Sequence, residues 1–327
     1  MKDKILKILK DSNDYISGQK ICDKLSVSRT AVWKTIKALK EAGYEIDSIS
    51  NKGYKLISEP DLVDEFAITN LFAPEDKKIN IYYSDEIDST NNKAKKLGEQ
   101  GALHGSLVIA DSQTGGRGRR GRSFLCPNGV GIWMSLLLRP NVSPDRAPML
   151  TIVTAMSVAR ALKNITQCEN IQIKWPNDIV MNGKKICGIL TEMSSEIECV
   201  NYVVIGVGIN VNTPVFPKEL ETSATSIFIE SGTKYKRAAI VVEFLRCFED
   251  CYNQFLKTNN LAMIMNDYNS MLISMDKEVY IIENNDKKVR VSKGIDEIGR
   301  LIVYDEQSNE ERIIAGEVSV RGLYGYT

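Results

Sequence analysis

The run Thr114-Gly115-Gly116-Arg117-Gly118-Arg119-Arg120-Gly121-Arg122 lies between two apolar segments, Ser106–Ala110 and Gly131–Leu138. Both flanking segments have the length and composition of strands, so the run is expected to be a loop between them. It mixes four arginines with four glycines. Glycine allows positive φ and close backbone approach, and arginine offers a planar fork of donors that suits phosphate or carboxylate. Chemistry on an acyl or phosphoryl anion is therefore the first expectation.

Three other interpretations of this loop compete. Gly116, Gly118 and Gly121 have the G-x-G-x-x-G spacing of a dinucleotide site, but that site needs a helix directly after the glycines, and Pro127 and Asn128-Gly129 indicate a turn. A disordered arginine-glycine tail that binds nucleic acid would not have strands on both sides. A plain solvated charged loop would not explain the regular alternation of glycine and arginine.

The segments around the loop predict a mixed α/β sheet. A helical pattern covers Met149–Leu162, and Ser89-Thr90-Asn91 is placed to cap another helix. Helix capping alone would explain these three residues, although a helix N-terminus also gathers donors for a ligand. Strand-like runs are expected at Ile79–Tyr83, Leu107–Asp111, Gly131–Leu138, Ile171–Lys174, Ile186–Thr191 and Tyr202–Val211.

Two further segments contain residue types that are common in catalytic or binding sites. Lys174-Trp175-Pro176-Asn177-Asp178 is followed by the apolar run Lys184–Leu190, so the pair predicts a β-hairpin that brings Asp178 and Lys185 together. The alternative is a surface turn with a salt bridge, which would add little stability. Gly206-Val207-Gly208-Ile209-Asn210 places glycines inside a strand, where they usually mark close approach of a ligand or another backbone.

The first sixty residues resemble a separate DNA-binding module. Three amphipathic helical patterns are followed by two alternating segments, Tyr44–Ile49 and Gly53–Ile57, as in a winged helix-turn-helix. These residues contain 12 Lys and Arg against 8 Asp and Glu, a modest positive surplus. A purely structural three-helix module is the alternative. The residues expected to contact DNA are Ser28, Arg29, Thr30, Trp33, Lys34 and Lys37.

Composition excludes several classes of protein. The 327 residues carry 42 basic and 42 acidic side chains, so a uniformly basic nucleic-acid binder is excluded. Seven cysteines without a Cys-x-x-Cys pair and a single histidine argue against a zinc site and against a Ser-His-Asp triad, and no metal ligands are expected. No apolar run is long enough to span a bilayer and no signal peptide begins the chain, so a cytoplasmic location is expected.

The ordered set of motifs resembles a known family. The motifs are Gly116–Arg122, Lys174–Asp178, Lys185–Leu190, Gly206–Asn210 and the near-terminal Gly316-Glu317-Val318-Ser319-Val320-Arg321. Together they are similar to those of bifunctional biotin–protein ligases that double as biotin operon repressors, over essentially the whole chain. The resemblance implies that biotin and MgATP give biotinyl-5′-adenylate and pyrophosphate, and that a lysine of a biotin carboxyl carrier protein or carboxylase carrier domain then takes the biotin as an amide.

The resemblance also implies roles for particular residues. Arg119, Lys185 and Asp178 would be catalytic, with Asp178 orienting or deprotonating the incoming lysine amine. Phe124 stands where tryptophan is common in the family. The biotin-site positions fall on Ser89, Thr90, Asn91, Gln113, Arg117, Gly118, Arg119 and Lys185. The nucleotide-site positions fall on Arg119, Arg122, Phe124, Lys174, Asn177, Asn210 and Arg321.

The implied fold class is α+β with three domains. Residues 1–63 would be the winged helix-turn-helix, 64–271 the catalytic domain of biotin/lipoate ligase type, and 272–327 an SH3-like β-barrel, which short alternating segments such as Glu278–Ile282 also favour. The implied cofactors are ATP and Mg²⁺, with biotin as substrate. The implied partners are the carrier, operator DNA and a second copy of the chain when loaded with adenylate. Two alternative functions are a lipoate-type ligase and a ligand-sensing repressor without catalysis.

Overall fold

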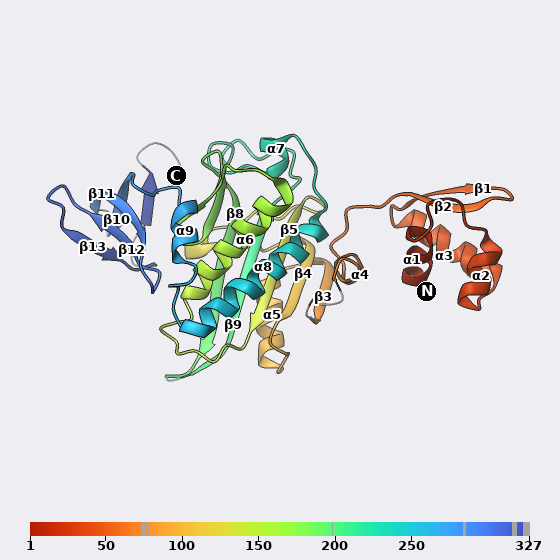
Figure 1. Ribbon diagram of the computed structural model, residues 1–327, viewed down its shortest axis with the longest axis horizontal. Helices are drawn as coiled ribbons and strands as arrows, with labels where there is room; N and C mark the ends of the chain where they lie inside the picture. The colour runs from red at the N-terminus through yellow and green to blue at the C-terminus, as the bar shows by residue number, and fades with distance from the viewer. Residues whose placement is uncertain (74–75, 77–78, 198, 284–285, 316–318, 323–327) are drawn as a thin grey trace. The chain divides into compact units, whose positions relative to one another are not determined.

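The computed structural model describes the chain except residues 74–75, 77–78, 198, 284–285, 316–318 and 323–327, and describes only the backbone of residues 3, 283 and 319–322. The chain divides into two compact units, Met1–Leu62 and Val63–Thr327 (Figure 1). The division of the larger unit into a catalytic domain and a tail domain stays a prediction. No helix of the described residues is long and apolar enough to cross a membrane.

The first unit contains the predicted winged helix. Buried Ile5, Ile21 and Ile36 join the three helices in one core. Ser17 and Ser28 cap the second and third helices by accepting hydrogen bonds from backbone N–H groups three residues later. The elements are α1 Lys2–Lys10, α2 Gly18–Leu25, α3 Arg29–Glu41 and the antiparallel pair β1 Glu45–Ile49 and β2 Gly53–Ser58.

The second unit is built on a seven-stranded mixed sheet in the order β3-β4-β5-β9-β8-β7-β6. Strands β3 and β4 are parallel, and every other neighbouring pair is antiparallel. The sheet therefore confirms the mixed α/β prediction. Its strands are β3 Ile81–Ile87, β4 Ser106–Gln113, β5 Gly131–Leu138, β6 Ile171–Lys174, β7 Asp178–Met181, β8 Lys184–Ser195 and β9 Val200–Asn210.

Helices cover both faces of this sheet. On one face α5, Thr90–Glu99, packs Ala94 and Leu97 against Val108, Leu137 and Val204. On the other face α6, Met149–Thr166, and α8, Arg237–Thr258, share the main core with the alternate strand residues (Figure 1). This division explains why β5 is buried along its whole length and reads as a continuous apolar run. The shorter helices are α4 Glu65–Thr69, α7 Ile227–Ser231 and α9 Met265–Met271.

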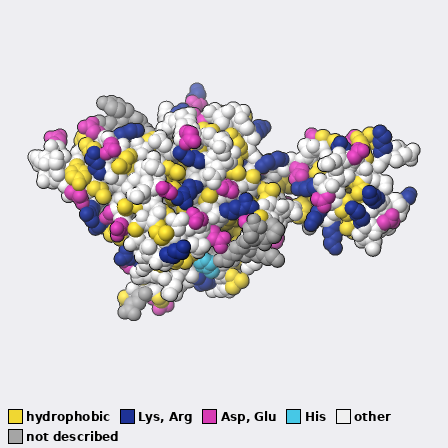
Figure 2. Space-filling view, in the orientation of Figure 1, with side chains coloured by type: hydrophobic (Ala, Val, Ile, Leu, Met, Phe, Trp, Pro, Cys, Tyr) yellow, Lys and Arg dark blue, Asp and Glu magenta, His cyan; other side chains and the backbone are white. Residues whose placement is uncertain are grey.

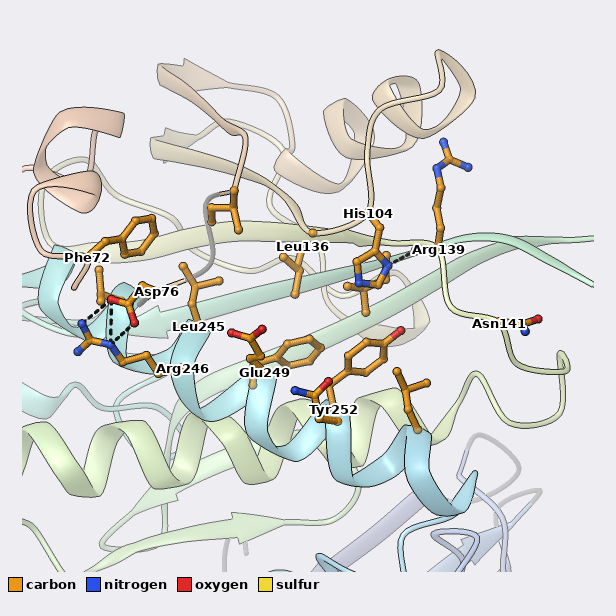
Figure 3. A pocket seen from close by; sticks show the side chains of 17 residues that line it. Phe72, Asp76, His104, Leu136, Arg139, Asn141, Leu245, Arg246, Glu249 and Tyr252 are labelled. Atoms are coloured by element: carbon orange, nitrogen blue, oxygen red, sulfur yellow. Dashed lines mark hydrogen bonds and ion pairs between the residues drawn. The ribbon is translucent and has the colours of Figure 1, made fainter. Parts of the chain in front are cut away.

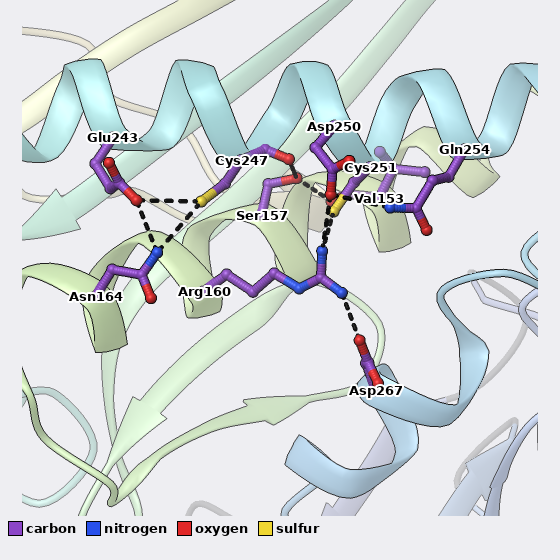
Figure 4. Close-up of polar contacts among 10 residues, drawn as sticks. All are labelled: Val153, Ser157, Arg160, Asn164, Glu243, Cys247, Asp250, Cys251, Gln254 and Asp267. Atoms are coloured by element: carbon purple, nitrogen blue, oxygen red, sulfur yellow. Dashed lines mark hydrogen bonds and ion pairs between the residues drawn. The ribbon is translucent and has the colours of Figure 1, made fainter.

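A polar cluster links α6, α8 and α9. The Arg160 guanidinium of α6 donates to Asp250 of α8 and to Asp267 of α9, and it also contacts the Cys251 thiol (Figure 4). Burial raises the pKa of Cys251 above its ordinary value. The thiol is therefore protonated near neutral pH, and its role is packing instead of metal binding or nucleophilic chemistry.

The tail is a small antiparallel sheet, as predicted. Its order is β13-β12-β11-β10-β14, and among the described residues no ladder joins the two edge strands β13 and β14. Closure into a barrel stays a prediction. The indole N–H of Trp175 donates to Gly299 O at 3.0 Å, which ties the tail to the end of β6. The strands are β10 Glu278–Glu283, β11 Asp286–Ile295, β12 Leu301–Tyr304, β13 Glu310–Ile313 and β14 Ser319–Gly322.

Candidate active site

The loop Thr114–Arg122, called the Gly/Arg loop below, leaves the sheet at the end of β4 and returns toward β5. Backbone bonds from Gly118 N to Arg122 O and from Phe124 N to Gly116 O fold it into a narrow excursion. A Cβ at Gly116 would lie 2.4 Å from Phe124 O, so this close approach requires glycine. A single 3-10 turn, η1 Arg119–Gly121, lies within the loop, but no α-helix follows the glycines directly, because β5 comes next and then α6. The dinucleotide interpretation is therefore excluded by the structure.

The N-terminus of α5 meets the base of this loop. Ser89 caps the helix by accepting from Asn92 N, which confirms the predicted cap. Thr90 N donates to Gln113 Oε1 at 2.7 Å, and Gln113 Nε2 donates to the Cys126 thiol at 3.1 Å. Burial raises the pKa of Cys126 to about 11, so the thiol stays protonated near neutral pH. Thr90, Gln113 and Cys126 thus form one hydrogen-bonded cluster, and Ser89 lies next to Thr90 in the chain.

Glycines in β8 and β9 make room for side chains of this site. A Cβ at Gly206 would lie 2.3 Å from Asn91 Oδ1. A Cβ at Gly208 would lie 2.8 Å from the Phe124 ring, and one at Gly188 would lie 2.8 Å from Lys185 Nζ. The close approach predicted for the glycines of β9 is therefore confirmed, and here other side chains of the protein occupy the space.

The predicted hairpin brings its two charged residues together. Lys185 Nζ lies 2.7 Å from Asp178 Oδ1, with both side chains mostly buried. Asn177 joins them to the loop, because its Nδ2 donates to Asp178 Oδ1 at 3.1 Å and its Oδ1 accepts from Arg119 Nη1 at 2.8 Å. Burial lowers the pKa of Arg119, the nearby Asp178 carboxylate raises it and Arg120 lowers it. The guanidinium is thus partly shielded from water, and its attraction to an anion is stronger there than in bulk water.

These elements enclose a first cavity of about 280 Å³. It brings together most of the predicted site residues, namely Ser89, Thr90, Asn91, Gln113, Arg117, Gly118, Arg119, Phe124, Asn177 and Lys185. Asp178 touches the cavity through Lys185 and Asn177. Arg122, Lys174 and Asn210 are not among its lining residues. Buried Asn210 donates to Thr225 O, and the side chain of Arg321 in β14 lies outside the described part of the structure.

A second cavity of about 380 Å³ adjoins the first. The two share Arg119, Ile189 and Leu190, and the second continues to Arg146 and to Gly299 and Arg300 of the tail. A guanidinium that faces both cavities can contact a ligand that spans them. This arrangement suits a substrate that is compact at one end and long and charged at the other.

Several lining residues were not predicted from the sequence. Met134, Ile189 and Val207 supply apolar wall, and Glu192 supplies a carboxylate. Glu192 lies one residue beyond the strand expected at Ile186–Thr191, so the sequence pattern gave no signal for it. Its closeness to Asn91, 101 residues earlier in the chain, arises only from the sheet order.

A third cavity, of about 320 Å³, lies elsewhere on the second unit (Figure 3). His104, Phe248 and Tyr252 line it, with the His104 and Tyr252 rings 5.7 Å apart. None of the predicted site residues is among its lining. Its wall combines apolar side chains of α8 with Arg139, whose guanidinium donates to Gly98 O at the end of α5. We assign these residues to packing of α8 on the sheet.

The predicted DNA-contacting residues lie on α3 or at its cap. Ser28 accepts from Ala31 N, and Arg29 donates to Gln19 Oε1. Trp33 is 54% exposed, with Lys37 Nζ 5.8 Å from its ring centroid. Thr30 and Lys34 are also exposed. A large exposed aromatic beside cations on one helix face is unusual for a purely structural module. Elsewhere the charges are mixed in sign, as Figure 2 shows over the visible face of the molecule.

Comparisons with known proteins agree with this arrangement. The Biotin/lipoate A/B protein ligase family matches residues 83–210, and an HTH domain family matches residues 2–55. The bifunctional ligase/repressor BirA of Bacillus spizizenii (strain ATCC 23059 / NRRL B-14472 / W23) is 38% identical over 94% of each chain. BirA of Bacillus subtilis (strain 168) is 43% identical over 75% of each chain.

Solved structures lead to the same family. The biotin protein ligase from Aquifex aeolicus, solved in complex with biotin and ATP, superposes with a TM-score of 0.65 and 29% sequence identity. That match covers 74% of this chain and 99% of the Aquifex chain. This chain thus combines an HTH domain match with a match to the biotin/lipoate ligase family. The chain belongs to the biotin–protein ligase family, among its bifunctional ligase/repressors.

Proposed function

We propose that the chain joins biotin to ATP and then to a carrier lysine. In the first step a biotin carboxylate oxygen bonds to the α-phosphorus of ATP, and the bond from that phosphorus to the pyrophosphate oxygen breaks. In the second step the lysine nitrogen bonds to the acyl carbon, a proton leaves the amine and AMP departs. The observation that carries this proposal is the convergence of the Gly/Arg loop, the start of α5 and Lys185 on one cavity.

The polar cluster at α5 would hold the ureido ring of biotin. This ring offers one strong acceptor and two N–H donors, and Ser89, Thr90, Asn91 and Gln113 offer both kinds of partner. Met134 and Val207 would contact the apolar remainder of the molecule. In such a closed site an unmatched polar group is costly, so the cluster would discriminate strongly between ligands.

The cations at the other end would hold the reacting groups. Arg117, Gly118, Arg119 and Lys185 would surround the biotin carboxylate and the α-phosphate, where negative charge changes as the adenylate forms. The second cavity begins at Arg119 and would take the nucleotide. The remaining nucleotide-site proposals are Arg122, Phe124, Lys174, Asn177, Asn210 and Arg321.

Mg²⁺ would enter with the triphosphate. Among the described residues no group of three or more His, Cys, Asp or Glu side chains could hold a metal ion. A dedicated cage is unnecessary, because Mg²⁺ in such sites keeps several waters and is bound mainly by substrate phosphates with one or two carboxylates.

The two charged residues of the hairpin would serve different half-reactions, Lys185 adenylate formation and Asp178 transfer. A Lys185→Ala variant should lose about 100- to 1000-fold in biotin-dependent pyrophosphate exchange, because one preorganised charge is removed from the transition state. An Asp178→Asn variant should instead lose more in transfer from preformed adenylate, because the amine loses its proton acceptor. Both rates can be measured with radiolabelled pyrophosphate and with isolated adenylate.

Lys184→Ala is the matched control for this pair. Lys184 is adjacent in β8, so its side chain points to the opposite face of the strand. We expect near wild-type rates in both half-reactions. If Lys185→Ala and Asp178→Asn each slowed both half-reactions equally, the proposed division of labour would be wrong.

The first unit would make the chain a repressor. Arg29, Thr30, Trp33, Lys34 and Lys37 would enter a major groove of operator DNA from α3. Two-fold operators need a dimer, so we propose that the adenylate-loaded chain forms a homodimer. ATP, the carrier and operator DNA together imply activity in the cytoplasm.

Mass spectrometry of a carrier domain incubated with the chain, biotin and MgATP tests the ligase. The expected result is one added biotinyl group on one lysine. Parallel incubations with lipoate or octanoate test the lipoate-type alternative. Absence of pyrophosphate release with biotin, lipoate and octanoate alike would leave only a ligand-sensing repressor.

A further inference from the structure

Lys185 lies at an irregular point of β8. The register between β7 and β8 shifts here, with Ile179 opposite Cys187 but Val180 opposite Lys185. The backbone of Lys185 bonds to the segment Ser223–Thr225, because Lys185 N donates to Ser223 O and Lys185 O accepts from Thr225 N, both at 2.9 Å. A bulge in a strand can re-aim a side chain. The direction of the Lys185 side chain therefore depends on this segment as well as on the sheet.

The Glu230 carboxylate of α7 holds the backbone around Lys185 from two places. Its Oε1 accepts from the hydroxyl of Thr225, a buried residue, at 2.7 Å. Its Oε2 accepts from Asn182 Nδ2 at 2.6 Å. Asn182 lies in the turn between β7 and β8, just before Lys185 in the chain. One carboxylate thus contacts both the turn that leads into Lys185 and the segment that pairs with it.

Further hydrogen bonds fix α7 and the segment to the end of β9. Asn210 Nδ2 donates to Thr225 O at 3.1 Å. Ser226 caps α7, and its hydroxyl donates to Thr213 O at 2.6 Å. The Asn210, Thr213 and Ser226 side chains are buried, so water competes little for these bonds. Glu230 therefore has a defined position relative to the segment that pairs with Lys185.

We infer that Glu230 is a positioning residue for Lys185, which it holds with Nζ at the first cavity and 2.7 Å from Asp178 Oδ1. Glu230 is not among the lining residues of the first or the second cavity, so it acts through Lys185 and does not contact the ligand. The inference rests on the proposed function, because it takes the Lys185 charge to stabilise adenylate formation. Displacing such a group by about 1 Å can cost about 100-fold in rate.

A double-mutant cycle on the full chain tests the inference. Glu230→Ala should slow biotin-dependent pyrophosphate exchange about 10- to 100-fold, and should slow transfer from preformed adenylate less, because it displaces Lys185. When Lys185 is already alanine, no ammonium remains to be positioned. Adding Glu230→Ala to Lys185→Ala should therefore change the exchange rate by less than about 2-fold. A merely structural role would slow the double variant by the same factor as the wild type.

Two substitutions of Thr225 test the same contact from its other side. Thr225→Val has nearly the same shape but lacks the hydroxyl, so exchange should slow as in Glu230→Ala. Thr225→Ser keeps a hydroxyl that can donate to Glu230, so it should restore the exchange rate. This pair tests the inference even if Glu230→Ala does not fold. Glu221→Ala, an exposed change before the segment, is the control and should have wild-type rates.

The outcomes separate this inference from the proposed function. Wild-type exchange in both Glu230→Ala and Thr225→Val would overturn the inference. A fully additive effect of Glu230→Ala in the Lys185→Ala background would also overturn it. A wild-type protein that gives no exchange with biotin, or a Lys185→Ala variant that exchanges at the wild-type rate, would instead contradict the proposed function.

Discussion

An Arg119→Gly variant should still form biotinyl-adenylate but release it at least about 100-fold faster than the wild type. Two charge-assisted hydrogen bonds to the intermediate would contribute about 1.5–3 kcal/mol each, and each 1.4 kcal/mol is tenfold in affinity. Free adenylate acylates exposed amines, so bystander proteins should become biotinylated. Western blotting of a mixture of carrier domain and unrelated protein measures this loss of selectivity.

The structure explains why this residue should have so large an effect. Arg119 is shared by the two adjoining cavities, so its guanidinium is placed where the biotinyl and nucleotide parts of an adenylate would join. Its Nη1 donates to Asn177 Oδ1, which holds the side chain toward the hairpin. Burial also makes the guanidinium a stronger partner for an anion than a solvated arginine would be.

Arg120→Gly is the matched control for this variant. Arg120 is the next residue of the same loop, has an exposed side chain and has a φ of 57°. Glycine adopts this conformation without a steric penalty, so the loop should keep its shape. We expect normal retention of adenylate. Equal release by both variants, or selective labelling by Arg119→Gly, would contradict the role given to Arg119.

The sequence predicted those parts of the fold that depend on local pattern. The predicted strands Gly131–Leu138 and Ile171–Lys174 have the bounds of β5 and β6. The caps at Ser28 and Ser89 were also predicted correctly. These features follow from side-chain chemistry within a few residues, which a single sequence displays directly.

Features that depend on the sheet order could not be predicted. Strand β8 was expected at Ile186–Thr191 but extends over Lys184–Ser195, because pairing with β9 continues through polar residues. Strand β7 was not predicted; it lies between the expected arms and pairs with both β6 and β8. Ser135 and Glu192 contact Asn91 only because the sheet order brings β5, β9 and β8 side by side.

The site was predicted better than the sheet for a physical reason. Loop glycines, clustered cations and a helix cap are recognisable as local chemistry, and the cavity gathers most of them. In the sequence, the polar residues that contact the cavity-lining residues from behind are indistinguishable from ordinary strand or helix surface. Sequence therefore indicated which residues line the cavity, and the structure indicated which residues contact them from behind.

Removing residues 1–62 should abolish specific operator binding and leave adenylate synthesis. These residues form a compact unit with the predicted recognition helix. Specific complexes are typically about 10³- to 10⁷-fold tighter than non-specific ones, so the loss should exceed about 1000-fold. A gel-shift titration with operator DNA measures it, and biotin-dependent pyrophosphate exchange on the same preparation checks that the remaining unit is folded.

A point variant separates DNA contact from deletion of a whole unit. Trp33 and Lys34 are exposed on α3. Replacing both by alanine should therefore weaken operator binding about 10- to 100-fold at fixed salt without unfolding the core formed by Ile5, Ile21 and Ile36. Lys7→Ala, an exposed change on α1, is the control and should have little effect. Equal weakening by both changes would indicate only a general charge effect.

Biotinyl-adenylate should control operator binding, because the first unit has too few positive charges to hold DNA tightly by itself. A surplus of about four positive charges on one copy neutralises few phosphates, so tight binding needs two copies on one operator. If adenylate orders Thr114–Arg122, the entropic cost of dimer contact falls and the DNA-competent state is favoured. Operator affinity should then rise with biotin and ATP, fall steeply with salt, and fall again when unmodified carrier consumes the adenylate. An operator affinity that is indifferent to biotin and ATP would leave the winged helix as a constitutive DNA anchor, and the coupling would be wrong.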